Sequence, residues 1–533
     1  MQWLDSGTYP LLAPILQTLA IVACFTIQKR LLFNRIGFEE KEYSRSFLFP
    51  ALLKSPRGAL VTIGPMLLGV LFFHRLQWQV IAADGGYVWM IVTVLVVTCS
   101  WAYACMPYNY YYGKLHLYDR VLMVALALGA VWHPLFTAPF LATVLAFVSQ
   151  LRFPLQLFSY TDKQPLFDLL NLSVCFLYVR VMAPSTSPIR YLFLSLCVMG
   201  AYYFAPGVKK LRIGWLGKEQ LQRLLLAARD NGWLHWLGLE KIRAAVAFIG
   251  RTNTILLWLV MAVELGAILM LLNVKLAVIL LVGSLIVHVG IFAASGILFW
   301  KWIIVNLTLV ASLLSLSQAG LQEVFAIQSF LLSLVLFGLN SFWLSPNKLG
   351  WLDTSLSPAF RFQCQLEDGI VCELIPAQMT PYDFPMAQGR LYPLAQTPIL
   401  TRTYGTTSDA HTMRAVEDAQ SVDEMRATID RWGRVEAGEA GGHTYTVRFL
   451  QRYFGNLNHH LAKGRGLGAG LLAKCHAPLH IYTGHVLSMP PFDGSRQIRR
   501  IQVSFVYSWL RGTETVPVVD KLVLDVAIPL SSG

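Results

Sequence analysis

Residues 253–296 read NTILLWLVMAVELGAILMLLNVKLAVILLVGSLIVHVGIFAASG. They contain two apolar stretches, 253–272 and 276–296, with only a few residues between them. A helix needs about 20 mostly apolar residues to cross the hydrocarbon core of a bilayer. The run therefore predicts two membrane-spanning helices joined by a short turn, carrying the ionisable side chains Glu264 and His288.

Similar apolar stretches occur throughout the first 350 residues. They are 11–27, 58–82, 86–106, 166–183, 190–206, 302–318 and 325–344. The stretch 119–151 is long enough for one tilted helix or for a pair that turns at His133-Pro134. The sequence thus predicts a mainly α fold, a polytopic helical membrane bundle of about nine to eleven spans over residues 1–350.

The composition agrees with a membrane protein. Of the 533 residues, 55% are hydrophobic and only 14% are charged, against roughly 25% charged in soluble domains. A single water-soluble globule is therefore excluded. The net charge of +13 lies entirely in residues 1–350, which hold 26 basic and 13 acidic residues, whereas residues 351–533 hold 17 of each. A nucleic-acid surface would need an exposed basic patch, which an apolar region does not offer.

Two basic segments indicate the orientation of the bundle. Residues 28–57 carry seven basic and three acidic residues, and residues 207–251 carry nine and three. By the positive-inside rule both should face the cytoplasm, with the N-terminus outside. The side of the C-terminal region then depends on whether 119–151 crosses once or twice. Residues 218–239 predict an amphipathic helix, with Arg223 and Arg229 on its polar face, that either lies in the membrane interface or docks on the bundle.

Residues 351–533 have the composition of a separate soluble α+β domain. Residues 360–375 predict a hairpin that turns at Glu367-Asp368-Gly369, and 444–454, 498–510 and 520–530 alternate as strands do. Residues 414–435 predict a polar helix. Cys364 and Cys372 could face each other across the hairpin, as a disulfide outside the cytoplasm or as free thiols inside it.

Polar side chains within apolar segments are costly and suggest function. Lys209 and Lys210, which end the run AYYFAPGVKKL, either set the topology as juxtamembrane charges or include an amine whose apolar wall and neighbouring cation favour its neutral form. Glu264 is either a hydrogen-bond partner between helices or a site residue. His288 is either a packed core histidine or part of the same site.

Residues 202–215, YYFAPGVKKLRIGW, resemble a segment of the vitamin K-dependent gamma-glutamyl carboxylases and their bacterial relatives, the horizontally transferred transmembrane (HTTM) domain proteins. In that family an aromatic-rich helix is followed by Gly, a lysine pair, Leu and Trp. An acidic residue in the next span precedes a histidine, as Glu264 precedes His288. The resemblance extends over roughly residues 10–345.

The resemblance implies an integral-membrane enzyme of a bacterial cytoplasmic membrane that uses reduced vitamin K, a menaquinol-type hydroquinone, and no metal. Lys210 would be the base, acting with Glu264 and His288, and Lys209, Trp215 and Tyr203 would bind the quinol. In the family, deprotonation of the hydroquinone and its oxygenation to the epoxide drive carboxylation of a glutamyl substrate. The C-terminal domain would dock a peptide or protein substrate, and no nucleic acid is expected.

One family motif is missing. In the carboxylases an Asn-His motif follows an Asp-Lys pair, whereas Asp162-Lys163 is followed here by QPLFDLLNL, in which Asp168 or Asn171 could take its place. The missing motif weakens the expectation of carboxylation more than the expectation of quinol binding. Two other functions stay open: a non-catalytic membrane scaffold whose C-terminal domain binds a partner, and a transporter, for which no internal repeat is seen.

Overall fold

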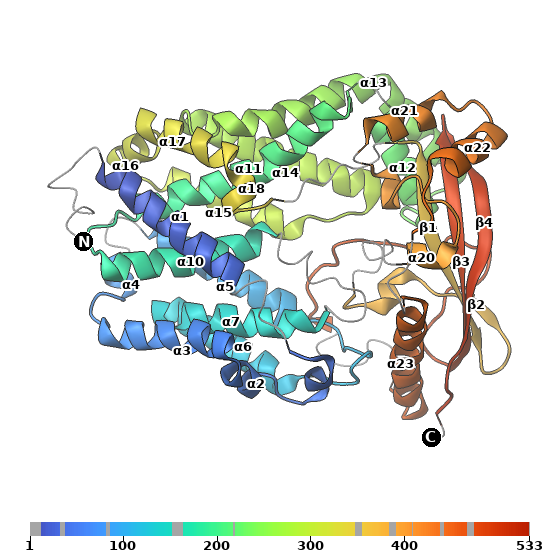
Figure 1. Cartoon of the computed structure of the whole chain (residues 1–533), viewed down its shortest axis with the longest axis horizontal. Coiled ribbons are helices and arrows are strands. Elements are labelled where there is room, and N and C mark those ends of the chain that lie inside the picture. Colours follow the sequence, from blue (N-terminus) through green and yellow to red (C-terminus); the bar gives the residue numbers. More distant parts are fainter. Residues whose placement is uncertain are drawn as a thin grey trace.

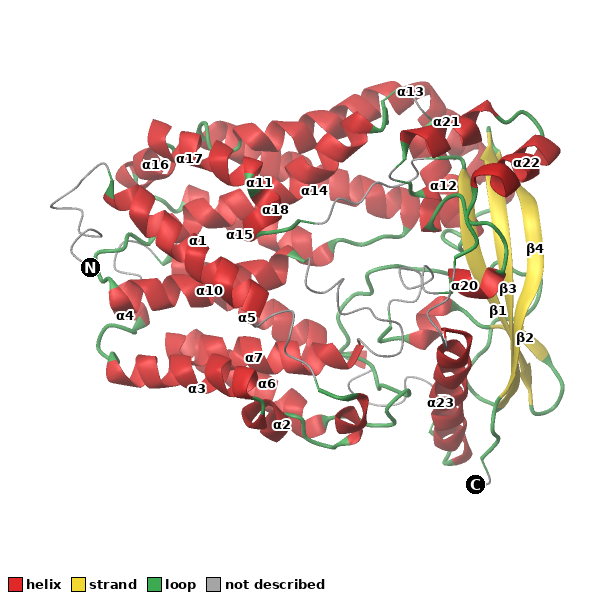
Figure 2. Cartoon of the chain, in the orientation of Figure 1, coloured by secondary structure: helices red, strands yellow, loops and turns green. Residues whose placement is uncertain are grey.

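A computed structural model describes residues 12–31, 38–81, 86–151, 164–216, 219–346, 354–382, 391–407, 409–436, 442–465 and 474–531. Long helices lie side by side along the long axis of the molecule, and a β-sheet stands at one end of the bundle (Figures 1 and 2). The main helices of the bundle are α1 (Ala13–Leu31), α3 (Pro56–Leu71), α5 (Tyr87–Ala104), α6 (Leu117–Trp132), α7 (Thr137–Val148), α10 (Pro165–Met182), α11 (Ile189–Arg212), α13 (Leu239–Gly266), α14 (Val274–Ser295), α15 (Trp300–Leu314), α16 (Gln318–Val324) and α17 (Ile327–Gly338).

Six helical segments of the described chain are long and apolar enough to cross a membrane. They are Tyr87–Ala104, Pro134–Leu151, Pro165–Met182, Ile189–Arg212, Leu239–Leu269 and Val274–Ser295. The bent pair α16–α17 would make a seventh, and the apolar helices α3 and α15 are shorter. The helical bundle is thus as expected, and the count of nine to eleven spans stays a prediction.

The stretch 119–151 forms a pair of helices, the second of the two predicted arrangements. The helices α6 and α7 turn at His133-Pro134, where the His133 Nδ1 atom accepts a hydrogen bond of 3.1 Å from the backbone N–H of Leu135. Because proline has no N–H to donate, it is well placed at the first position of the turn that follows α6.

The C-terminal region folds around a four-stranded antiparallel sheet of order β2-β1-β3-β4. Its strands are β1 (Leu356–Leu366), β2 (Val371–Glu373), β3 (Ile498–Arg511) and β4 (Glu514–Ala527). The predicted hairpin and the last two predicted strands are confirmed. Cys364 and Cys372 are directly opposite in the register of β1 and β2, and both are free, buried thiols.

Two expectations for this region are wrong. Residues 444–454 lie within the helix α23 (Gly442–Ala462) and do not form a strand. The buried residues of this helix are spaced so that they form one face, and they are Phe449, Leu450, Tyr453, Phe454 and Leu457. The short alternation of polar and apolar residues in 444–454 suggests a strand instead. The predicted polar helix over 414–435 is two helices, α21 (Ala410–Asp418) and α22 (Val422–Trp432), because Ser421 caps a new N-terminus at the backbone N–H of Glu424.

The C-terminal region packs directly on the bundle. One set of buried apolar side chains runs from the bundle helices into the sheet and α23. Glu40, in the first basic segment, pairs with Arg448 at 3.1 Å and with Arg452 at 3.0 Å on α23. The predicted domain boundary at residue 350 lies outside the described residues.

The second basic segment also contacts the sheet region. Its helix α12 (Gln220–Asp230) packs against α13, α14, β3 and β4, so of the two predicted placements the docked one is observed. Arg223 is buried and forms a bidentate ion pair with Glu417, with N–O distances of 2.6 and 2.7 Å. Asp230 forms an ion pair with Arg361 at 2.9 Å. Arg223, on the predicted polar face of this helix, therefore contacts the C-terminal region.

Candidate functional site

A cavity of about 270 Å³ lies where the bundle meets the C-terminal region. Tyr202, Pro206 and Lys210 of α11 line it, because residues four apart share one face of a helix. Its volume is slightly below the range of roughly 300–1,000 Å³ typical of small-molecule sites. The space therefore suits a small ring system better than a whole lipid.

Lys210 and Glu264 form a buried ion pair at this cavity. Their exposed fractions are 6% and 8%, and the Lys210 Nζ atom donates a hydrogen bond to Oε1 of Glu264. No hydrogen-bond partner among the described residues reaches Oε2 of Glu264, although that atom is buried. A Cβ atom on Gly207 would lie 3.0 Å from the Glu264 Cβ atom, so the absence of a side chain lets α11 and α13 approach closely.

The ion pair bears on two alternatives left by the sequence. Lys210 is buried and paired, so it is not an exposed juxtamembrane charge. Glu264 is a hydrogen-bond partner between helices, and its second carboxylate oxygen is buried without a hydrogen-bond partner among the described residues. The centre of the Trp215 ring lies 4.9 Å from Nζ of Lys210, close enough for a cation–π contact.

His288 lies in an aromatic cluster on the same cavity. Its ring centre is 5.0 Å from that of Phe299, 5.5 Å from that of Trp302 and 5.8 Å from that of Tyr203. The Tyr203 hydroxyl accepts a hydrogen bond of 2.5 Å from the side-chain amide of Asn306. The buried Nδ1 atom of His288 has no hydrogen-bond partner among the described residues.

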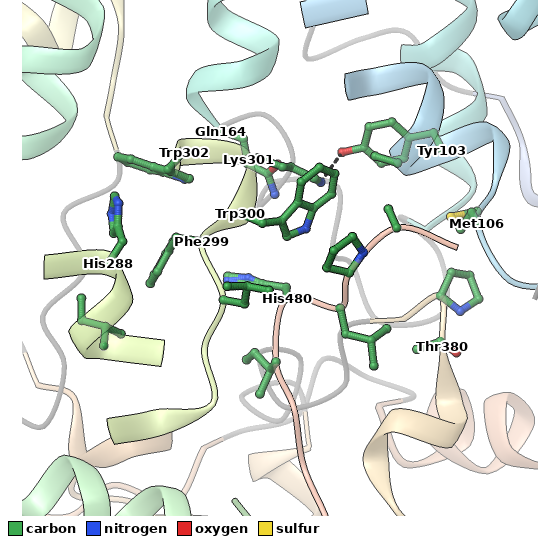
Figure 3. A pocket seen from close by; sticks show the side chains of 18 of the residues that line it. Tyr103, Met106, Gln164, His288, Phe299, Trp300, Lys301, Trp302, Thr380 and His480 are labelled. Carbon is green, nitrogen blue, oxygen red and sulfur yellow. Dashed lines mark hydrogen bonds between the residues drawn. The ribbon is translucent and has the colours of Figure 1, made fainter. Parts of the chain in front are cut away.

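The C-terminal region supplies one wall of the cavity, which the sequence did not indicate. The backbone N–H of Leu298 donates to the carbonyl of His480 at 2.7 Å, joining the segment between α14 and α15 to residues 476–481. Phe299 lies between His288 and His480, whose ring centre is 5.3 Å away (Figure 3). Burial lowers the pKa of His480 to about 3, so this imidazole is neutral at physiological pH.

A second lysine lines the cavity from α15. The Lys301 Nζ atom donates to the Tyr103 hydroxyl at 3.0 Å and to the Gln164 side-chain oxygen at 3.4 Å (Figure 3). It also lies 5.6 Å from the centre of the Trp300 ring. The sequence patterns did not indicate that Lys301 belongs to the site.

The structure brings together most of the residues predicted from the sequence. Lys210, Glu264, His288 and Tyr203 all line the cavity, Trp215 contacts the Lys210 ammonium, and Lys209 is half-buried and does not line it.

The residues considered for the missing Asn-His motif lie elsewhere. Asp168 and Asn171 are buried in α10 and do not line the cavity, and Asp162-Lys163 lie outside the described residues. Within the described ranges, no three His, Cys, Asp or Glu side chains are arranged to hold a metal ion.

Comparison of the chain with protein-family models, with curated proteins and with solved structures finds no match.

Proposed function

We propose that this protein is an integral-membrane enzyme. Besides the six apolar helices, the exposed faces of α13 and α14 support a position within the membrane. In the most apolar part of each helix, only 22% of the residues of α13 and 28% of those of α14 are buried. Ile255, Trp258, Ile279 and Ile286 are exposed. Exposed apolar helix faces of this kind indicate contact with lipid rather than water.

The side of the membrane follows from the contacts of the two basic segments. Glu40 lies in the first and Arg223 in the second, and both pair with the C-terminal region. The positive-inside rule places both segments in the cytoplasm, so the C-terminal region and the cavity wall that it supplies are cytoplasmic as well. This agrees with the free thiols of Cys364 and Cys372, because disulfides are rare in a reducing compartment.

Cys475 tests this orientation, because it is the exposed cysteine of the described residues and lies beside the cavity wall. A membrane-impermeant maleimide should label inverted sealed vesicles and spare right-side-out ones. The Cys475→Ser variant should lose the label in inverted vesicles. Labelling of Cys475 in intact right-side-out vesicles would show that the C-terminal region is outside.

The function that the site supports best is quinol-dependent chemistry. The observation that carries this proposal is a small aromatic cavity with two buried, unpartnered polar atoms, Oε2 of Glu264 and Nδ1 of His288. These atoms could hold a hydroxyl group of a hydroquinone, and Tyr203, Phe299 and Trp302 provide ring surfaces for its apolar body. A scaffold would need no cavity with such atoms, so they favour the enzyme.

A bound hydroquinone of the vitamin K type would supply oxygen-dependent chemistry that yields an epoxide. The protein's part is to bind it, exclude water and remove a proton. To take a proton from the ligand, Lys210 would first pass one of its own to Glu264 along the hydrogen bond that joins them. Carboxylation of a glutamyl or other substrate is the finer proposal that the family resemblance adds.

The experiment uses the full chain in lipid nanodiscs with 1,4-naphthohydroquinone and oxygen. Spontaneous oxidation gives the quinone, so the 2,3-epoxide, separated by chromatography, is the product to follow. Enzyme-dependent epoxide formation supports the proposal. Hydroquinone oxidation that yields only the quinone, at the rate of empty nanodiscs, refutes it.

A further inference from the structure

A second buried ion pair lies close to the cavity and has no part in the proposed function so far. Asp168 of α10 is fully buried, and the Lys29 Nζ atom of α1 lies 2.7 and 2.8 Å from its two oxygens. Lys29 also donates to the carbonyl of Leu344 at 2.6 Å. Ionisable groups inside an apolar bundle are costly to bury, and they commonly mark proton or ion pathways.

Tyr202 connects this ion pair to the cavity. Its hydroxyl donates a hydrogen bond of 2.7 Å to Oδ2 of Asp168, and the residue lines the same cavity as Lys210. The two residues are eight positions apart on one face of α11, which is a rise of about 12 Å. Two pairs of ionisable groups therefore lie along this helix, Lys210 with Glu264 and Tyr202 with Asp168, and Tyr202 joins the second pair to the cavity.

A hydroquinone carries two hydroxyl groups on opposite sides of its ring. An apolar cavity that hydrogen-bonded only one of them would leave the other buried without a partner, at a cost in affinity. We propose that Tyr202 binds the second hydroxyl of the ligand and relays its proton to Asp168. This inference rests on the proposed function and adds a second proton-accepting end to its site.

The relay conserves atoms and charge. Tyr202 takes the proton of the ligand hydroxyl as its own O–H bond breaks and its proton forms a new O–H bond on Asp168. The electron pair of the broken ligand O–H bond stays on the ligand oxygen, and Asp168 becomes a neutral carboxylic acid. Lys29 then keeps its hydrogen bond to the Leu344 carbonyl, so its ammonium is not left without an acceptor.

A purely structural role of Tyr202 and the Lys29–Asp168 pair would give a different binding result. In that case the Lys29–Asp168 pair only fixes α1 against α10, and Tyr202 only satisfies a carboxylate oxygen. The binding of a ligand would then not depend on whether it carries one hydroxyl or two. The two roles are therefore separated by comparing 1,4-naphthohydroquinone with its monomethyl ether, 4-methoxy-1-naphthol.

The test is anaerobic binding of both compounds to the full chain in nanodiscs, measured by quenching of tryptophan fluorescence. The variant is Tyr202→Phe, which keeps the ring that packs edge-on against Trp302 at 5.3 Å. The matched control is Tyr191→Phe, because Tyr191 is also a buried tyrosine of α11 whose hydroxyl bonds to α10, at Ser173, but it does not line the cavity.

Tyr202→Phe should weaken hydroquinone binding about five- to tenfold, the usual effect of losing one ligand hydrogen bond, and should leave binding of the ether within about twofold. Tyr191→Phe should change neither. Unchanged hydroquinone binding in Tyr202→Phe, or an equal loss for both compounds, would overturn the relay while the proposed function stands. If the wild-type protein binds neither compound, the proposed function fails and the relay with it.

Discussion

Lys210→Arg is expected to leave the protein folded and to reduce epoxide formation by roughly 10²- to 10⁴-fold, the usual contribution of a positioned base. Arginine keeps the positive charge and can still pair with Glu264, so the buried carboxylate is not left alone. Its guanidinium, however, stays protonated in proteins and cannot take a proton from a ligand. The substitution therefore separates the charge of residue 210 from its ability to act as a base.

The measurement is the initial rate of epoxide formation in nanodiscs, together with the unfolding temperature of each variant. Lys275→Arg is the control, because Lys275 is exposed at the start of α14 and does not line the cavity. It should retain the wild-type rate. A Lys210→Arg variant that keeps its rate within about threefold would show that residue 210 does not act as the base.

Lys29→Met is expected to cause the largest loss of stability, about 3–5 kcal/mol in the free energy of unfolding. The substitution leaves Asp168 as a buried carboxylate without its counter-charge, and only Tyr202 still donates to it among the contacts described above. Replacing both partners, in Lys29→Met with Asp168→Leu, should recover most of that loss, because the apolar side chains remove the buried charges altogether.

Denaturant unfolding in detergent, followed by circular dichroism, gives these free energies. Lys41→Met is the control, since Lys41 pairs with Glu39 on the exposed surface and should contribute no measurable stability. Equal stabilities of Lys29→Met and the wild-type protein would contradict a buried, charged Asp168. A double variant less stable than Lys29→Met would contradict the same account.

The sequence patterns correctly predicted the helices and strands whose surroundings change little along their length. The helix α14 and the second half of α13 are mostly apolar, and the strands β3 and β4 alternate over parts of their length. The pattern failed at α23, where a helix packs one face on the sheet and its short aromatic run also fits a strand. Local propensity is weak in such a segment, and tertiary contacts decide its structure.

The candidate site was partly predictable for a similar reason. Lys210, Glu264 and His288 are conspicuous because charged or polar side chains in apolar segments are rare. His480 and Tyr202 carried no such signal. His480 reaches the cavity through a contact between segments about 180 residues apart, and a tyrosine in an aromatic helix is indistinguishable from core until Asp168 is placed beside it.

The central claim is that the cavity beside Lys210 binds the hydroquinone, and filling the cavity tests it most directly. Ala102 of α5 lines the cavity and is half-buried, so Ala102→Phe should occupy ligand space. Leu259→Phe, on the exposed face of α13, controls for added aromatic surface. In anaerobic tryptophan-quenching titrations with 1,4-naphthohydroquinone, Ala102→Phe should lower affinity more than tenfold and Leu259→Phe should match the wild-type protein. If Ala102→Phe, folded and with an unchanged unfolding temperature, binds as tightly as the wild-type protein, the hydroquinone does not bind in this cavity.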